Sequence, residues 1–116
     1  MLCKVNGHTH IPHCFGVWKS MMAMVMSLHT VEGKSLTLEG AMHSNVMEKE
    51  NGIKYLTQVA TALSHVHDKG YLHNDVKGNN IILGTTRLGD VQAYLTDFGE
   101  SCHQTEGKIY SLPVIE

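Results

Sequence analysis

The sequence predicts an α+β fold, because one long segment has helical periodicity and several short apolar runs have the length of strands. Two apolar runs, 11–17 and 22–28, come before the helical segment, and two more, 79–83 and 93–96, come after it. Short apolar runs bounded by turn residues are typical of strands. We therefore expect two early strands, a long helix and a later hairpin.

The two early runs are separated by Trp18, Lys19 and Ser20, which we expect to form a tight turn between two strands. Residues 32–36 follow as a linker, and residues 36–42 have the composition to begin a short helix.

The long helix is expected between Asn51 and Gly70, where apolar residues recur in steps of three and four. Gly70 is a plausible helix stop. The stripe is expected to be a core face and also the apolar surface most prone to association. It consists of Ile53, Leu56, Val59, Leu63 and Val66.

The later runs, Asn79–Leu83 and Ala93–Thr96, are expected to pair as an antiparallel hairpin, with Gly84, Gly89 and Asp90 as turn residues. A turn centred near Leu88 and Gly89 places Asn80 opposite Asp97, with Cβ atoms ~5 Å apart.

An amide oxygen and a carboxylate at that separation suit a nucleotide-bound magnesium ion, which keeps water and substrate phosphates as its other ligands. The sequence therefore predicts that Asn80 and Asp97 bind Mg²⁺ together with ATP. Asp75 lies on the loop before the hairpin, where its carboxylate can accept a proton from a substrate hydroxyl. Lys77 lies two residues further on and adds a fixed positive charge to the same loop.

These residues resemble two motifs of protein kinases. The run from Tyr71 to Leu83 resembles the catalytic loop, and Asp97-Phe98-Gly99 resembles the metal-binding triplet. The triplet alone is more often an ordinary turn, so the resemblance depends on the whole set at these offsets.

The resemblance implies an enzyme that transfers the γ-phosphoryl group of Mg-ATP to a protein hydroxyl. It assigns Asp75 as general base or orienter, Lys77 as an electrostatic aid, Asn80 and Asp97 as magnesium ligands, and His73 as a structural residue. Lys77 favours serine or threonine over tyrosine as the acceptor.

The same resemblance, in a less specific form, makes residues 11–28 the fourth and fifth strands of the small lobe. On that alignment Met26 guards the back of the adenine pocket, and the backbone of Ser27 and of His29 binds the adenine edge. Ile82 forms the pocket floor. Without the downstream motif, a methionine-rich strand is more often plain core.

The chain is therefore expected to be a partial protein kinase domain, a fragment of the two-lobed fold. Residues from about 2 to 31 would be the last small-lobe strands and the hinge, and residues from about 32 to 116 would run from the start of the large lobe through the activation segment. Residues 110–116 only weakly resemble the end of that segment. Asn74 stands where most members of the family carry Arg, so activity is not expected to depend on phosphorylation of the activation segment.

No glycine-rich loop and no phosphate-holding lysine are found in the 116 residues, so we expect little catalysis from this chain alone. Their absence also motivates an alternative, a pseudokinase-like binding or regulatory module. A small-molecule kinase ranks lower, because such enzymes often lack a lysine at the position of Lys77 and carry a different triplet from Asp-Phe-Gly.

The net charge of −2 and the pI near 6.5 give no basic surface for nucleic acid or an anionic membrane. The apolar run 21–26 is far shorter than the ~20 residues of a membrane span.

Cys3, Cys14 and Cys102 argue against a disulfide scaffold and for a reducing compartment. We expect an intracellular, cytoplasmic location. The histidines, among them His8 and His10, lack the spacing of a structural zinc site, and oligomeric state and protein substrate are left open.

Overall fold

The computed structural model describes residues 2–44 and 48–104 of the chain. Their helices are α1 (Leu38–His43) and α2 (Lys49–Asp68), with 3₁₀ turns at Leu2–Val5, Lys19–Met21 and Gly78–Asn80. Their strands are β1 (Cys14–Trp18), β2 (Ala23–Met26), β3 (Leu36–Thr37), β4 (Tyr71–Leu72), β5 (Ile81–Thr85), β6 (Val91–Leu95) and β7 (Cys102–His103). This mixture of helices and antiparallel strands confirms the predicted α+β class.

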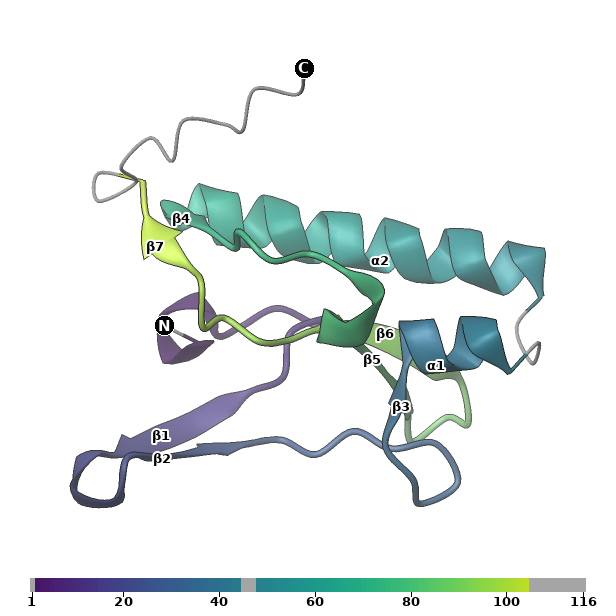
Figure 1. Ribbon diagram of the computed structural model, residues 1–116, viewed down its shortest axis with the longest axis horizontal. Coiled ribbons are helices and arrows are strands. Elements are labelled where there is room, and N and C mark those ends of the chain that lie inside the picture. The colour runs from purple at the N-terminus through teal and green to yellow at the C-terminus, as the bar shows by residue number, and fades with distance from the viewer. Residues whose placement is uncertain (1, 45–47, 105–116) are drawn as a thin grey trace.

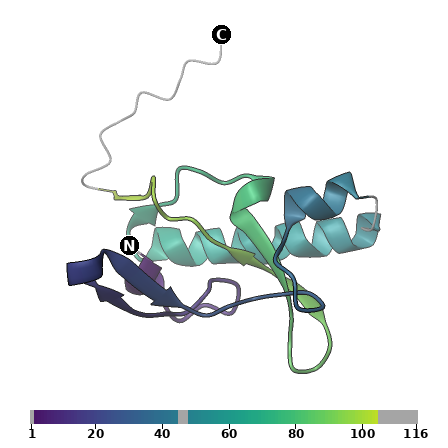
Figure 2. The same cartoon turned by 60° about the horizontal axis from the view of Figure 1, so that its bottom comes forward.

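The described strands form three small antiparallel sheets, β1–β2, β3–β5–β6 and β4–β7. In Figure 1 the long helix α2 runs across the molecule, with α1 and the β3–β5–β6 sheet beneath it and the β1–β2 hairpin farthest from it. Figure 2 shows the tip of the β5–β6 hairpin projecting away from α2. The main core lies where α2 and α1 cover the three-stranded sheet. Its buried members are Val5, Ile11, Cys14, Leu38, Ala41, Tyr55, Val59, Ala62, Val66, Ile81, Leu83, Ala93, Leu95 and Phe98.

The helix α2 confirms the predicted long helix and its stop. The backbone N–H of Gly70 donates to the carbonyl of His67, and Gly70 has a φ of 87°, a conformation that glycine adopts without strain. The predicted stripe is wrong in its first half, because Ile53 and Leu56 are 60% and 57% exposed. The face that α2 buries consists of Tyr55, Val59, Ala62 and Val66.

Two of these buried residues, Tyr55 and Ala62, did not belong to the predicted stripe. The sheet packs against α2 with a large aromatic ring at one end of the contact and a small side chain further along it. Close packing selects side chains by shape as well as by hydrophobicity. Hydrophobic periodicity does not measure shape, so it predicted a face of α2 that is turned away from the buried one.

The β5–β6 hairpin forms as predicted, but Gly84 lies inside β5 and not in the turn. A Cβ atom at Gly84 would lie 2.7 Å from the Cβ of His29 and 3.1 Å from a ring carbon of Tyr94. Gly84 is therefore required by the close approach of the chain at His29. The turn itself is closed by a hydrogen bond from Thr86 N–H to the carbonyl of Asp90.

The β1–β2 hairpin also forms as predicted, with the turn at Lys19–Met21. It carries more exposed apolar surface than α2 does, contrary to the expectation that the helix stripe would be the main exposed face. The exposed side chains in and around this hairpin are Phe15, Val17, Trp18, Met21, Met22, Met24, Val25, Met26 and Leu28. Exposed apolar side chains concentrated in one part of the fold favour association.

Cys14 is disulfide-bonded, and Cys102 is a free thiol. One such bond does not make a disulfide scaffold. It does weaken the argument from the cysteines for a reducing compartment, because disulfides persist mainly in oxidising ones. Among the described residues, no helix has both the length and the apolar character needed to cross a bilayer.

Three histidines connect the N-terminal segment to α2 and β6. His10 Nδ1 lies 2.9 Å from the carbonyl oxygen of Ala93, and His65 Nε2 lies 2.9 Å from that of Val5. The ring of His8 lies beside both other rings, with centroids 5.7 Å from His10 and 5.2 Å from His65. Burial, followed by the charges of His65 and then His10, lowers the pKa of His8 below its usual value.

This arrangement predicts a loss of stability in mild acid. Because the pKa of His8 is lower in the folded state, the unfolded chain binds the proton first as the pH falls through about 6.5. We expect the free energy of unfolding to decrease between pH 7.5 and pH 5.5, and His8→Gln to reduce that slope. Urea unfolding of the chain at several pH values measures it. His43→Gln is the control, since the side chain of His43 is 80% exposed, and an equal effect of both variants would contradict the assignment.

Candidate active site

Two loops lie side by side in the candidate site (Figure 1), residues 73–77 before β5 and residues 96–101 after β6. The imidazole of His73 lies with Nε2 2.9 Å from the carbonyl oxygen of Thr96, and the hydroxyl of Ser101 donates to the carbonyl of His73. These contacts join segments that are more than 20 residues apart in the sequence.

His73 is almost completely buried, with 1% of its surface exposed. Its Nδ1 accepts a hydrogen bond from the backbone N–H of Asp75, and its ring meets the ring of Phe98 edge-on, with centroids 4.8 Å apart. A neutral imidazole with its proton on Nε2 satisfies both polar contacts. His73 therefore fixes the backbone of Asp75 relative to Thr96.

The structure also brings Asn80 and Asp75 together. The buried amide of Asn80 donates from Nδ2 to the backbone carbonyl of Asp75 at 2.8 Å and to its carboxylate Oδ2 at 2.9 Å. The other carboxylate oxygen, Oδ1, lies 3.8 Å from the ammonium group of Lys77. The Asp75 side chain is 30% exposed, so it is oriented by its neighbours and still reaches the surface.

The predicted pairing of Asn80 with Asp97 is wrong by one residue. Ile81 lies opposite Leu95 in the ladder, and the N–H of Thr96 donates to the carbonyl of Asn80, so Asn80 faces Thr96. The turn is centred on Leu88 rather than between Leu88 and Gly89, which shifts the register. Asp97 comes directly after this last hydrogen bond.

The position of Asp97 is set by its own backbone and not by the ladder. Its φ is 59°, in the left-handed region that non-glycine residues seldom occupy, and its Oδ1 accepts a hydrogen bond from the N–H of Gly99. Asn74, in the neighbouring loop, has a φ of 68° and donates from Nδ2 to the carbonyl of Glu100. Left-handed residues of this kind are concentrated at functional sites.

The oxygen atoms of Asn80 and Asp97 that are unpaired among the described residues are of the chemical type that magnesium takes as ligands. Within residues 2–44 and 48–104, Asn80 Oδ1 accepts no hydrogen bond, and neither does Asp97 Oδ2. Amide and carboxylate oxygens are the hard ligands that Mg²⁺ prefers. In the same part of the chain no group of three or more His, Cys, Asp or Glu side chains is arranged to hold a metal, and this includes the histidines near His8.

The residues expected to bind adenine lie on two elements. Met26 ends β2 and is 40% exposed, whereas Ile82 lies in β5 opposite Tyr94. The N–H of Ser27 donates a hydrogen bond to the carbonyl of His13. No hydrogen bond to the carbonyl of Ser27 or from the N–H of His29 is found among the described residues, so these two groups remain able to bind a ligand.

Tyr94 is a contact that the sequence analysis missed. The ring of His29 stacks on it, with centroids 3.7 Å apart and an interplanar angle of 18°, and burial lowers the pKa of His29. Because directly paired residues point to the same face of a sheet, Tyr94 and Ile82 share a face. The alternation of β6 against β5 was the signal that would have found Tyr94.

Comparison with known proteins identifies similar sequences. The family model described as protein kinase domain matches residues 1–115. CBL-interacting serine/threonine-protein kinase 24 of Arabidopsis thaliana is 30% identical over 106 residues, which are 91% of this chain and 23% of that protein. Serine/threonine-protein kinase kin-29 of Caenorhabditis briggsae is 31% identical over 104 residues, which are 88% of this chain and 12% of that protein.

A third relative, the putative casein kinase I C03C10.2 of Caenorhabditis elegans, is 32% identical over 101 residues, which are 85% of this chain and 29% of that protein. The chain therefore spans less than a third of the length of each of these three relatives.

The contacts of His73 predict a stability effect. His73→Phe keeps an aromatic ring against Phe98 but leaves the carbonyl of Thr96 and the N–H of Asp75 without their partner. At ~1–3 kcal/mol for each of these two groups, we expect the free energy of unfolding to fall by about 2–6 kcal/mol. Denaturant unfolding of the chain measures it. His67→Phe, at an exposed position of α2, is the matched control, and similar losses in the two variants would contradict the role given to His73.

Proposed function

Because the chain belongs to the protein kinase family, we propose that the protein transfers the γ-phosphoryl group of Mg-ATP to a serine or threonine hydroxyl of another protein. Residues from about 2 to 31 are then the last small-lobe strands and the hinge, and the chain from about residue 32 belongs to the large lobe. The part assigned to the activation segment beyond residue 104 lies outside the described residues.

The observation that carries the proposal is the way in which Asp75 is held. Its N–H donates a hydrogen bond to Nδ1 of His73, and its carbonyl and Oδ2 accept hydrogen bonds from the amide of Asn80. Oδ1 is left facing the surface beside Lys77. A carboxylate fixed in this way can orient a substrate hydroxyl and accept its proton, which is the role we assign to Asp75.

Asn80 and Asp97 are the residues that we propose hold magnesium, through Asn80 Oδ1 and the carboxylate of Asp97. When bound, the ion would neutralise charge on the phosphate oxygens. Lys77 is 58% exposed and carries the positive charge nearest to Asp75 in the described loop. We assign it to the transferred phosphoryl group, whose oxygens carry the spread charge in a loose transition state.

For the adenine ring we propose the surface that lies between β2 and β5. The carbonyl of Ser27 and the N–H of His29 would bind the adenine edge, Met26 would close the back of the pocket, and Ile82 would form its floor. The support is that both backbone groups lack a hydrogen-bond partner among the described residues and that Ile82 is half-buried on the face it shares with Tyr94.

Serine or threonine is the proposed acceptor for two reasons. Lys77 occupies the position that favours these residues in the family, and the similar sequences from Arabidopsis thaliana and Caenorhabditis briggsae are named serine/threonine-protein kinases.

The proposal predicts the effect of removing each carboxylate from the complete protein. Asp75→Asn keeps the shape and removes the base, and we expect kcat for peptide phosphorylation to fall by ~10²–10⁴-fold with little change in nucleotide affinity. Asp97→Asn should instead weaken the binding of Mg-ATP. Radioactive phosphate transfer to serine and tyrosine peptides and equilibrium binding of Mg-ATP measure these effects.

Asp90→Asn is the matched control, since Asp90 is exposed in the β5–β6 turn and its carbonyl, not its carboxylate, closes that turn. Unchanged turnover in Asp75→Asn would remove the role of Asp75. Binding of Mg-ATP without any transfer by the unmodified complete protein would favour the pseudokinase-like alternative.

A further inference from the structure

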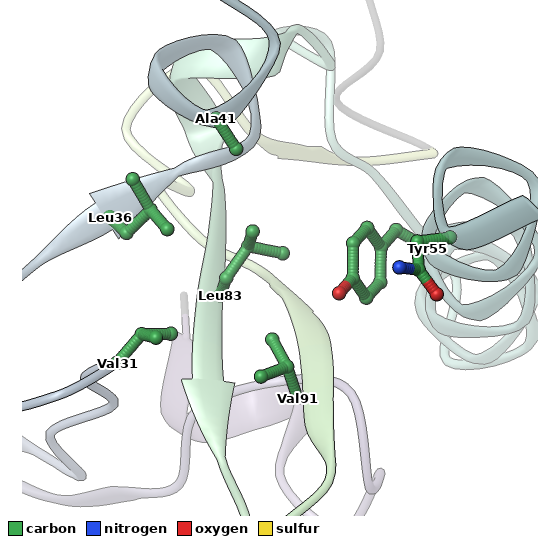
Figure 3. A pocket seen from close by; sticks show the side chains of 7 residues that line it. Val31, Leu36, Ala41, Tyr55, Leu83 and Val91 are labelled. Atoms are coloured by element: carbon green, nitrogen blue, oxygen red, sulfur yellow. The ribbon is translucent and has the colours of Figure 1, made fainter. Parts of the chain in front are cut away.

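A cavity of about 220 Å³ lies on the side of the β3–β5–β6 sheet that α1 and α2 cover (Figure 3). Figure 3 shows side chains from α1, α2, β3, β5, β6 and the segment before β3 pointing into it, with the ring of Tyr55 reaching from α2 toward Leu83 and Val91. The lining residues are Val31, Leu36, Ala41, Asn51, Tyr55, Leu83 and Val91.

The cavity is separate from the surface assigned to adenine. Leu36 pairs directly with Leu83, so both point to the same face of the sheet. Ile82, the next residue along β5, points to the opposite face. A molecule in the cavity would therefore contact β5 from behind the proposed nucleotide surface.

Its lining is mainly apolar, with two polar residues, Tyr55 and Asn51. Tyr55 is 6% exposed, its burial raises its pKa, and its hydroxyl makes no hydrogen bond within the described residues. The Tyr55 oxygen is nevertheless accessible. Among the described residues, the one unpaired side-chain atom that is completely enclosed is Thr86 Oγ1. Asn51 is exposed and also lines the cavity, where its amide is the other polar group.

Most of the lining offers water no partner. A well-held water needs two to four polar partners, and only Tyr55 and Asn51 among the lining residues carry polar side chains. An apolar cavity of ~150 Å³ binds benzene, so the larger volume here admits a single aromatic ring with a short substituent. A ligand that carries an acceptor would give the Tyr55 hydroxyl the hydrogen bond that it lacks among the described residues.

We propose that this cavity is a binding site for a small aromatic molecule that carries one hydrogen-bond acceptor, which the Tyr55 hydroxyl recognises. The acceptor sits between α2 and β6, and the ring is enclosed by the side chains of Leu36, Leu83 and Val91. Ala41 of α1 leaves the room that the ring occupies.

Two probes of nearly equal shape test the proposal. Acetophenone has a carbonyl acceptor, and ethylbenzene does not. Each is titrated into the 116-residue chain with ¹³C-labelled leucine and valine methyl groups, observed by NMR. We expect saturable shifts of the methyl groups of Leu36, Leu83 and Val91, with acetophenone bound ~2–10-fold more tightly than ethylbenzene. Val17 and Val25, on the exposed β1–β2 hairpin, should not follow the same curve.

Two variants separate recognition from simple apolar partitioning. Tyr55→Phe should keep the binding of both probes and remove the preference for acetophenone. Ala41→Leu should fill the cavity and abolish both shifts, whereas Ala60→Leu, at an exposed position of α2, should change neither.

The proposal is overturned if the cavity methyl groups of the unmodified chain do not shift, or if they shift no more than Val17 and Val25. It is also overturned if acetophenone and ethylbenzene bind equally well. These three outcomes are read on the unmodified chain, so they stand even where a variant fails to fold.

Discussion

A single buried imidazole holds the candidate site together. His73 contacts the loop after β6 through the carbonyl of Thr96 and its own loop through the N–H of Asp75. Each of these loops contains a residue in left-handed conformation, Asn74 in one and Asp97 in the other. Such backbone is unfavourable for ordinary side chains and persists only where surrounding contacts over-determine it. The polar geometry around Asp75 therefore depends on a residue that takes no part in the proposed chemistry.

The sequence was most informative where function constrains the order of polar residues. The offsets among Asp75, Lys77 and Asn80 placed them in one loop, and the structure joins them by hydrogen bonds and an ion pair. The same offsets did not fix the hairpin register, which the turn sets. A shift by one residue changes the partner of Asn80 from Asp97 to Thr96. Each such step also changes which side chains of the two strands share a face.

Other errors came from contacts between distant segments. Nothing local distinguishes Gly84 from a turn glycine, and its reason for being glycine is the approach of His29 from another part of the chain. The predicted buried face contained Ile53 and Leu56 but not Tyr55. Hydrophobic periodicity measures transfer from water and not the shape of the facing sheet. The stacking of His29 on Tyr94 joins residues 65 positions apart. Strand alternation can place Tyr94 on the face of Ile82, but nothing in the sequence near His29 predicts that its ring packs there.

The strand β5 connects these observations, because its alternating side chains serve two surfaces. Ile82 points to the side on which His29 and Tyr94 stack, and Leu83 points into the cavity bounded by α1 and α2. Gly84 then brings the segment at His29 against the strand with no side chain between them. A displacement of β5 from the cavity side would therefore move the contact at His29 directly, since close packing leaves no room to absorb it. The cavity and the proposed nucleotide surface therefore share the backbone of one strand and lie on its opposite faces.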